Sequence, residues 1–313
     1  MKKLLGIFVF LVVLNVLILF ATDSQRWGVN HFHLGQRIGM SGILCFGAGL
    51  LIITGGVDLS IGSVVGLCAC VFCTLFLDYK VPIPLAMLWT VAVGALAGLF
   101  NGLIVTYLRV QAFVVTLCGL FLFRGAARLV ANDQQPAIGD SLADLNDFFL
   151  GEFLAIPIYL WLLIGIFVVT TVFLHFTIFG RYFFAIGSNE KAARYSGINV
   201  DFYKVLAYVL CSMFAGVYAL LFVIHVNSVQ PSDTGSFLEL YAIAGAVLGG
   251  CSLRGGEGTT LGMFIGTAIL VLLPNLINMW GISSKVEPTV VGSALLVCAI
   301  MDEWLRRRGA SRA

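Results

Sequence analysis

Long apolar segments separated by short polar ones run along almost the whole chain. A helix that crosses a bilayer needs about 20 mostly apolar residues. Ten segments meet or approach that length, and they cover residues 4–21, 37–54, 61–77, 84–107, 112–131, 154–176, 204–226, 239–252, 259–280 and 286–303. The pattern predicts an all-α protein, a polytopic membrane helix bundle of about ten transmembrane segments in a single domain that spans residues 1–313.

Composition supports a lipid-facing surface. Of the 313 residues, 60% are hydrophobic and only 11% are charged, whereas a soluble globular protein carries about 25% charged residues. A net charge of +2 gives no support to a nucleic-acid partner. Gly94, Gly98 and Gly102 recur every four residues, a spacing that lets helix backbones approach closely in lipid.

Two glycine pairs indicate interrupted helices. Gly55-Gly56 and Gly255-Gly256 each suit a broken or re-entrant helix, and the segment 239–252 is short for a full span. Such breaks are tolerated only where protein or an aqueous cavity surrounds the backbone.

The distribution of Lys and Arg predicts orientation. With the N-terminus inside, ten spans also put the C-terminus inside, and twelve of the eighteen basic residues then fall on the inner side. The outer loop at about 132–153 holds five acidic residues and no basic one, whereas the tail 304–313 is basic. The sequence therefore predicts an N-in, C-in protein.

Motifs of catalysis are missing from the sequence. None of the six lysines follows a glycine, so a Walker A loop cannot occur. Cys70 and Cys73 lie in an unbroken apolar run, and His31 and His33 have no third ligand nearby, so we expect neither a metal site nor a disulfide. Transport remains as the function class.

The segment 54–63 carries the first informative pattern. A carboxylate at the bilayer centre costs about 2.5–3.5 kcal/mol, and Asp58 lies between two apolar segments. Asp58, Ser60 and Ser63 are candidates to cap the third helix at an interfacial turn. That interpretation is favoured over a direct role in transport, which stays open.

The segment 179–198 mixes charge with aromatic residues. Asn189 suits the N-cap of a short helix through Ala192 and Ala193 that stops at Gly197. A short helix that presents Tyr and Arg to the cytoplasm suits docking to a partner, and an interfacial amphipathic loop is the alternative.

Polar residues inside the apolar segments are candidates to line a pathway, and from sequence they are indistinguishable from helix-packing residues. They are Asn101, Thr116, Arg124, Glu239 and Asn275. Arg124 lies on one face of its segment with Arg128, and snorkelling or a structural ion pair is favoured over contact with a substrate.

Taken together, these blocks resemble the permease subunits of bacterial ABC importers for monosaccharides, the ribose, xylose, galactose and autoinducer-2 group. The resemblance runs from about Leu34 to Met301. It rests on the block 55–62, on the order of residues in 179–198, and on Glu239-Leu240 with the glycine clusters that follow. Ala112-Phe113 and Cys118 depart from the family pattern, so the particular sugar is left open.

The resemblance implies a multi-pass subunit of the bacterial inner membrane that binds no cofactor itself. Its partners would be a second permease chain, identical or a sister, a cytoplasmic ABC ATPase that uses ATP, and a periplasmic solute-binding protein. The signature turn would comprise Gly55, Gly56, Asp58, Ser60 and Gly62. The coupling loop, about 177–203, would use Gly180, Arg181, Ala185, Gly187, Asn189, Glu190, Ala192, Ala193 and Gly197.

Two other function classes compete with this interpretation. A self-contained secondary transporter driven by an ion gradient needs several membrane-embedded acids or histidines, whereas Asp58, Glu239, His175 and His225 all lie near segment ends. A structural membrane scaffold would show no dependence on a solute.

Overall fold

The computed structural model describes residues 2–21, 27–286, 288–293, 296 and 300. Its α-helices are α1 (Lys2–Ala21), α2 (Trp27–Ile53), α3 (Ile61–Leu77), α4 (Ile83–Tyr107), α5 (Ala112–Val130), α6 (Ala143–Leu150), α7 (Ile158–Thr171), α8 (Ile178–Ser188), α9 (Glu190–Tyr195), α10 (Val200–Val226), α11 (Leu238–Leu248) and α12 (Thr260–Met279). Short elements accompany these helices: 3-10 turns at Gly139–Leu142 and Ser284–Val286, a π turn at Val172–Phe176 that extends α7, and a hairpin of β1 (Glu152–Phe153) with β2 (Ile156–Pro157).

Six described helices are long and apolar enough to cross a membrane: α2, α4, α5, α7 with its π turn, α10 and α12. Three shorter apolar helices accompany them, at Leu5–Ala21, Ile61–Leu77 and Leu238–Leu248. The predicted all-α, multi-pass architecture is confirmed. Half of the predicted tenth segment, 286–303, and all of the basic tail, 304–313, lie outside the described residues.

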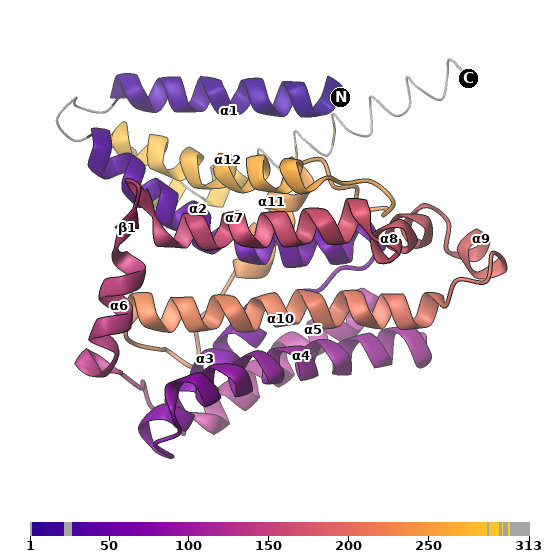
Figure 1. Cartoon of the computed structure of the whole chain (residues 1–313), viewed down its shortest axis with the longest axis horizontal. Coiled ribbons are helices and arrows are strands. Elements are labelled where there is room, and N and C mark those ends of the chain that lie inside the picture. Colours follow the sequence, from indigo (N-terminus) through magenta and orange to yellow (C-terminus); the bar gives the residue numbers. More distant parts are fainter. Residues whose placement is uncertain (1, 22–26, 287, 294–295, 297–299, 301–313) are drawn as a thin grey trace.

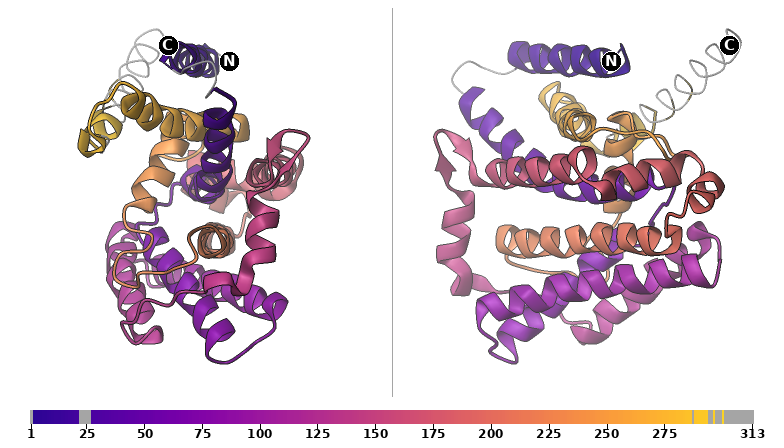
Figure 2. Two further views of the ribbon diagram at one scale, coloured as in Figure 1. Left: turned by 90° about the vertical axis from the view of Figure 1, so that its left-hand side faces the viewer. Right: turned by 45° about the vertical axis from the view of Figure 1, so that its right-hand side comes forward.

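The long helices lie side by side along the long axis of the molecule (Figure 1). One half of the bundle contains α1, α12, α2 and α7, and the other contains α10, α3, α4 and α5 (Figure 1). Helix α10 contacts α2, α3 and α4 and so joins the two halves, while the short helix α11 runs obliquely between them (Figure 2).

Close packing of α4 on α10 uses the predicted glycine face. An added Cβ at Gly94 would lie 2.6 Å from the backbone oxygen of Ser212, and one at Gly98 would collide with the backbone of Tyr208. Large apolar side chains on the opposite faces are exposed, with Leu96 at 59% and Phe121 of α5 at 70%. These helices therefore present an apolar surface that suits lipid.

Helix α2 begins at Trp27, whereas the hydrophobic pattern predicted a start at residue 37. The first turns are polar, but their side chains find partners inside the protein. Asn30 and Asn275 of α12 bond through both amides, at 2.9 and 3.3 Å. The Gln36 amide donates to the Leu150 oxygen at 3.4 Å. Because these polar groups are satisfied, the helix extends beyond its apolar run, and it includes His31 and His33.

The predicted outer loop at 132–153 is also more ordered than expected. It contains the 3-10 turn Gly139–Leu142, helix α6 and strand β1. Apolar residues of this segment, among them Ile138 and Leu142, are buried at 3% and 2% exposure, so it packs onto the bundle.

Candidate functional site

The turn between α2 and α3 contains the signature residues, and it begins with a glycine-dependent helix end. The Gly55 amide donates to the Ile52 oxygen at 2.9 Å, and the Gly56 amide donates to the Leu51 oxygen at 3.1 Å. This is the bonding of a Schellman motif, which places its glycine in the left-handed region. Gly55 has φ +84°, so a side chain at this position is strained.

Asp58 and Ser60 hold the other end of the turn. Asp58 is 1% exposed, and its Oδ1 accepts bonds from the Ser60 amide at 2.7 Å and from the Ser60 hydroxyl at 2.6 Å. The Asn101 amide of α4 donates to the same hydroxyl at 2.9 Å. Ser60 therefore connects a buried carboxylate to a neighbouring helix.

The predicted side-chain cap of α3 is wrong. Ser60 occupies the N-cap position, but its side chain makes no capping hydrogen bond, because the hydroxyl donates to Asp58. Ser63 is 1% exposed, and its hydroxyl has no hydrogen-bond partner among the described residues. The turn is instead fixed from outside, where Tyr208 of α10 donates to the Val57 oxygen at 3.3 Å.

The first turn of α3 meets the start of α11. A side chain at Gly62 would collide with the backbone oxygen of Gly235 and with the carboxylate of Glu239, and Glu239 is only 8% exposed. Arg124 of α5 donates to the Thr234 oxygen at 2.5 Å and to the Pro231 oxygen at 3.4 Å. Glu239 and Arg124 thus attach the segment before α11 to α3 and α5.

Two further polar residues of α5, Thr116 and Arg128, form local bonds. Thr116 donates to the backbone of its own helix, at Ala112, over 2.9 Å. Arg128 shares a face with Arg124 but pairs with Asp133 through bonds of 2.6 and 2.8 Å. Its guanidinium lowers the pKa of that exposed carboxyl group below the ordinary value. Local bonds therefore account for Thr116 and Arg128.

The coupling region forms two helices at one end of the bundle (Figure 1). Asn189 ends α8 and caps α9, because its side chain accepts from the Ala192 amide at 3.0 Å. Gly197 follows with φ +83°. The predicted short helix with an Asn cap and a glycine stop is therefore confirmed.

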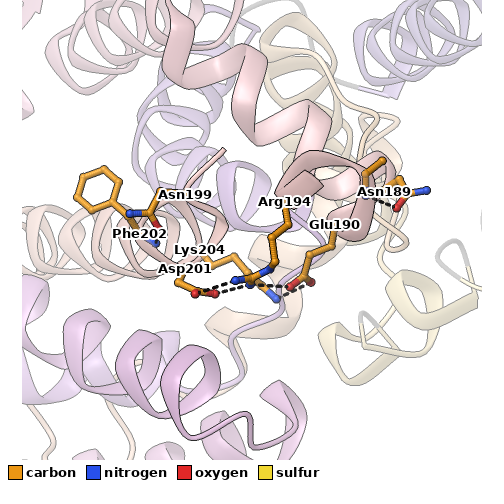
Figure 3. A network of polar contacts seen from close by, with 8 residues as sticks. Asn189, Glu190, Arg194, Asn199, Asp201, Phe202 and Lys204 are labelled. Atoms are coloured by element: carbon orange, nitrogen blue, oxygen red, sulfur yellow. Dashed lines mark hydrogen bonds and ion pairs between the residues drawn. The ribbon is translucent and has the colours of Figure 1, made fainter. Parts of the chain in front are cut away.

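Ion pairs attach α9 to the start of α10 (Figure 3). Arg194 donates to both carboxylate oxygens of Asp201, at 3.0 and 2.5 Å, and it lies 3.7 Å from Glu190. Lys204 donates to Glu190 at 2.9 Å. Single exposed pairs contribute little, about 0–1 kcal/mol, but this network fixes the direction of α9. Tyr195 at its end remains 91% exposed.

Backbone contacts join the coupling region to the signature turn. The Gly256 amide donates to the Ile53 oxygen at the end of α2, at 2.8 Å. A side chain at Gly187 of α8 would collide with both of those atoms. An added Cβ at Gly255 would lie 2.8 Å from the Gly55 nitrogen. Three chain segments that are distant in sequence therefore meet at glycine backbones, with no side chain between them.

A cavity of about 370 Å³ lies elsewhere, between α2, α10, α11 and α12. Its walls include Arg37, Ser41, Tyr218, His225, Tyr241 and Thr267. None of the five sequence candidates for the pathway belongs to its lining. Its residues come from four helices with no shared motif, so sequence reasoning missed it. Among the described residues, no group of three or more His, Cys, Asp and Glu side chains is arranged to hold a metal ion.

The long apolar helices and their exposed apolar faces define a multi-pass membrane protein. Residues 36–300 match the family described as "Branched-chain amino acid transport system / permease component". The chain belongs to this family.

Curated relatives agree with that assignment. The ribose import permease protein RbsC of Escherichia coli is 34% identical over 96% of this chain and 92% of its own length. The protein of the same name from Bacillus subtilis is 35% identical over 96% and 93%. The autoinducer 2 import system permease protein LsrC of Klebsiella pneumoniae is 36% identical over 85% and 76%. No solved structure matches the chain significantly.

The comparisons confirm the resemblance inferred from the signature turn, the coupling loop and the C-terminal block. Like the relatives that it matches, the chain is a permease subunit and not an enzyme. They give no support to the alternative of a self-contained secondary transporter.

Proposed function

We propose that the chain forms the translocation pathway of an ABC importer for a monosaccharide or a similar small hydroxylated solute, and that a partner ATPase powers it. The names of the ribose and autoinducer 2 import permeases support the solute class. One observation carries the coupling role. Ion pairs hold α9 to the start of α10, and α8, which precedes α9, packs directly against the end of α2 beside the signature turn.

The proposed assembly follows from that role. A cytoplasmic ATPase docks on α8 and α9, so this end of the bundle faces the cytoplasm. The chain is a single permease domain of about ten spans in the bacterial inner membrane, with its N-terminus and C-terminus inside. A second permease chain completes the pathway, and a periplasmic solute-binding protein delivers the sugar. The chain itself binds no cofactor.

The proposed mechanism uses the glycine contacts as a rigid connection. A displacement of α8 acts on the Ile53 carbonyl and on Gly256, because Gly187 has no side chain to absorb it. The turn then moves with the end of α2, and Asp58 and Ser60 transmit the displacement to the start of α3. Packed interfaces of this kind shift between discrete arrangements and do not deform continuously.

Purification of the native complex tests the proposal. The wild-type chain is expected to bring along a subunit with a Walker A motif and to support ATP-dependent sugar uptake in proteoliposomes. Arg181→Glu reverses an exposed charge on α8 and is expected to lose the ATPase while the chain still folds. Lys80→Glu is the matched control, because Lys80 is exposed on the α3–α4 connection. A wild-type chain that purifies alone and moves solute down an ion gradient would contradict the assignment.

A further inference from the structure

The cavity between α2, α10, α11 and α12 has the wall chemistry of a small-molecule site. Ligand sites are mostly apolar clefts of roughly 300–1,000 Å³ with a few convergent polar groups, and this cavity measures about 370 Å³. Tyr218, Phe222 and Tyr241 supply rings, and Ser41 and Thr267 supply hydroxyl groups. We propose that this cavity binds a neutral monosaccharide during transport, an inference that rests on the proposed function.

The charge of the lining selects the ligand class. Arg37 is the permanent cation of the wall, His225 adds an imidazole, and no carboxylate lines the cavity among the described residues. A guanidinium donates up to five hydrogen bonds and accepts none, so it recognises the hydroxyl oxygens of a sugar. Aromatic faces pack against the C–H groups of a pyranose or furanose ring. Arg37 repels a cationic solute. An anion is also disfavoured, because Arg37 alone would have to offset the cost of placing its charge in a largely apolar wall.

Helix α11 connects this cavity to the coupling machinery. Leu238, Tyr241 and Ala242 of α11 lie in the wall. Glu239, which follows Leu238 in the first turn of α11, does not belong to the wall, and its carboxylate contacts Gly62 of α3. A displacement of α3 therefore acts on the helix that bounds the cavity, and Figure 2 shows that α11 lies between the two halves of the bundle. A binding site at such a wall would open and close with the ATPase cycle.

Chemical modification after assembly tests the site without disturbing folding. Ser41→Cys is nearly isosteric, so the variant is expected to assemble, and its own uptake before treatment is the baseline for each measurement. The purified complex in proteoliposomes is treated with N-ethylmaleimide, uptake of radiolabelled D-ribose, D-xylose and D-galactose is measured, and mass spectrometry identifies the modified cysteines. The wild-type complex is the matched control, because it carries the exposed Cys118 and the buried Cys45 of the same cavity.

Modification at position 41 is expected to lower uptake at least tenfold, and a saturating concentration of the transported sugar is expected to slow that modification. Complete modification with unchanged uptake would overturn the proposal. A residue 41 that stays unmodified through repeated turnover would overturn it as well, because the wall of a pathway must meet water. Failure of the proposed function is distinguishable, since the untreated wild-type complex would then take up none of the sugars.

Discussion

The hydroxyl of Ser60 is the feature whose energetic role is defined most sharply by the structure. It donates to Asp58 at 2.6 Å and accepts from Asn101 at 2.9 Å, in a site where Ser60 is fully buried. Ser60→Ala removes both bonds and leaves the amide of Asn101 without that acceptor. Buried hydrogen bonds contribute about 0.5–1.5 kcal/mol each in soluble proteins and about 0.6 kcal/mol on average between membrane helices. The expected loss is about 1–3 kcal/mol in the free energy of unfolding.

Unfolding in mixed micelles of dodecyl maltoside and dodecyl sulfate measures that loss. Ser63→Ala is the matched control, because Ser63 lies three residues further on in the first turn of α3, is also buried, and has a hydroxyl without a partner among the described residues. The control is expected to cause no loss in the free energy of unfolding, because no bond is removed and a buried hydroxyl without a partner is itself unfavourable.

A double-mutant cycle separates the contact from general effects of truncation. Asn101→Leu alone is expected to destabilise the protein, but in the Ser60→Ala background it should cost less, with a coupling energy of at least about 0.5 kcal/mol. Equal losses for Ser60→Ala and Ser63→Ala, or strict additivity in the cycle, would refute the role assigned to this hydroxyl.

Three further perturbations test other contacts. Gly62→Ala is expected to prevent stable assembly, because a Cβ at this position overlaps backbone, whereas Gly125→Ala meets nothing within 4 Å and should leave the yield of folded protein in size-exclusion chromatography unchanged. Asn189→Ala removes the cap of α9 and is expected to destabilise that helix by about 1 kcal/mol, so protease cleavage between α8 and α10 should accelerate while the rest of the chain stays resistant. Arg124→Met releases the segment before α11 and should lower sugar uptake severalfold, whereas Arg128→Met removes an exposed ion pair and should not; equal uptake by both variants would contradict the anchoring role.

Hydrophobic patterning predicted the helices well, and short-range chemistry predicted the coupling helix. Apolar runs and the Asn189 cap both depend on neighbours within a few residues, so they are visible in sequence. The start of α2 was missed because its polar side chains are satisfied by partners far along the chain, such as Asn275 for Asn30.

Long-range contacts set the limit of the sequence prediction for the candidate site. The signature turn was found, but its polar side chains do not cap α3, because Ser60 bonds Asp58 and receives a bond from Asn101, 41 residues away. The role of Arg124 depends on carbonyl groups more than 100 residues further along. The cavity combines residues from four helices that are distant in sequence, and no local pattern records that combination.

The contact between Gly55 and Gly255 has a consequence for biogenesis. Translation proceeds at about 5–20 residues per second, so roughly 10–40 s separate the synthesis of these two glycines. During that interval the break between α2 and α3, with its buried carboxylate, lacks the backbone that later packs against it. Exposure of such a break to lipid is costly, so the emerging chain must be sheltered by the insertion machinery until its last third arrives. The permease therefore completes its folding late, as one unit.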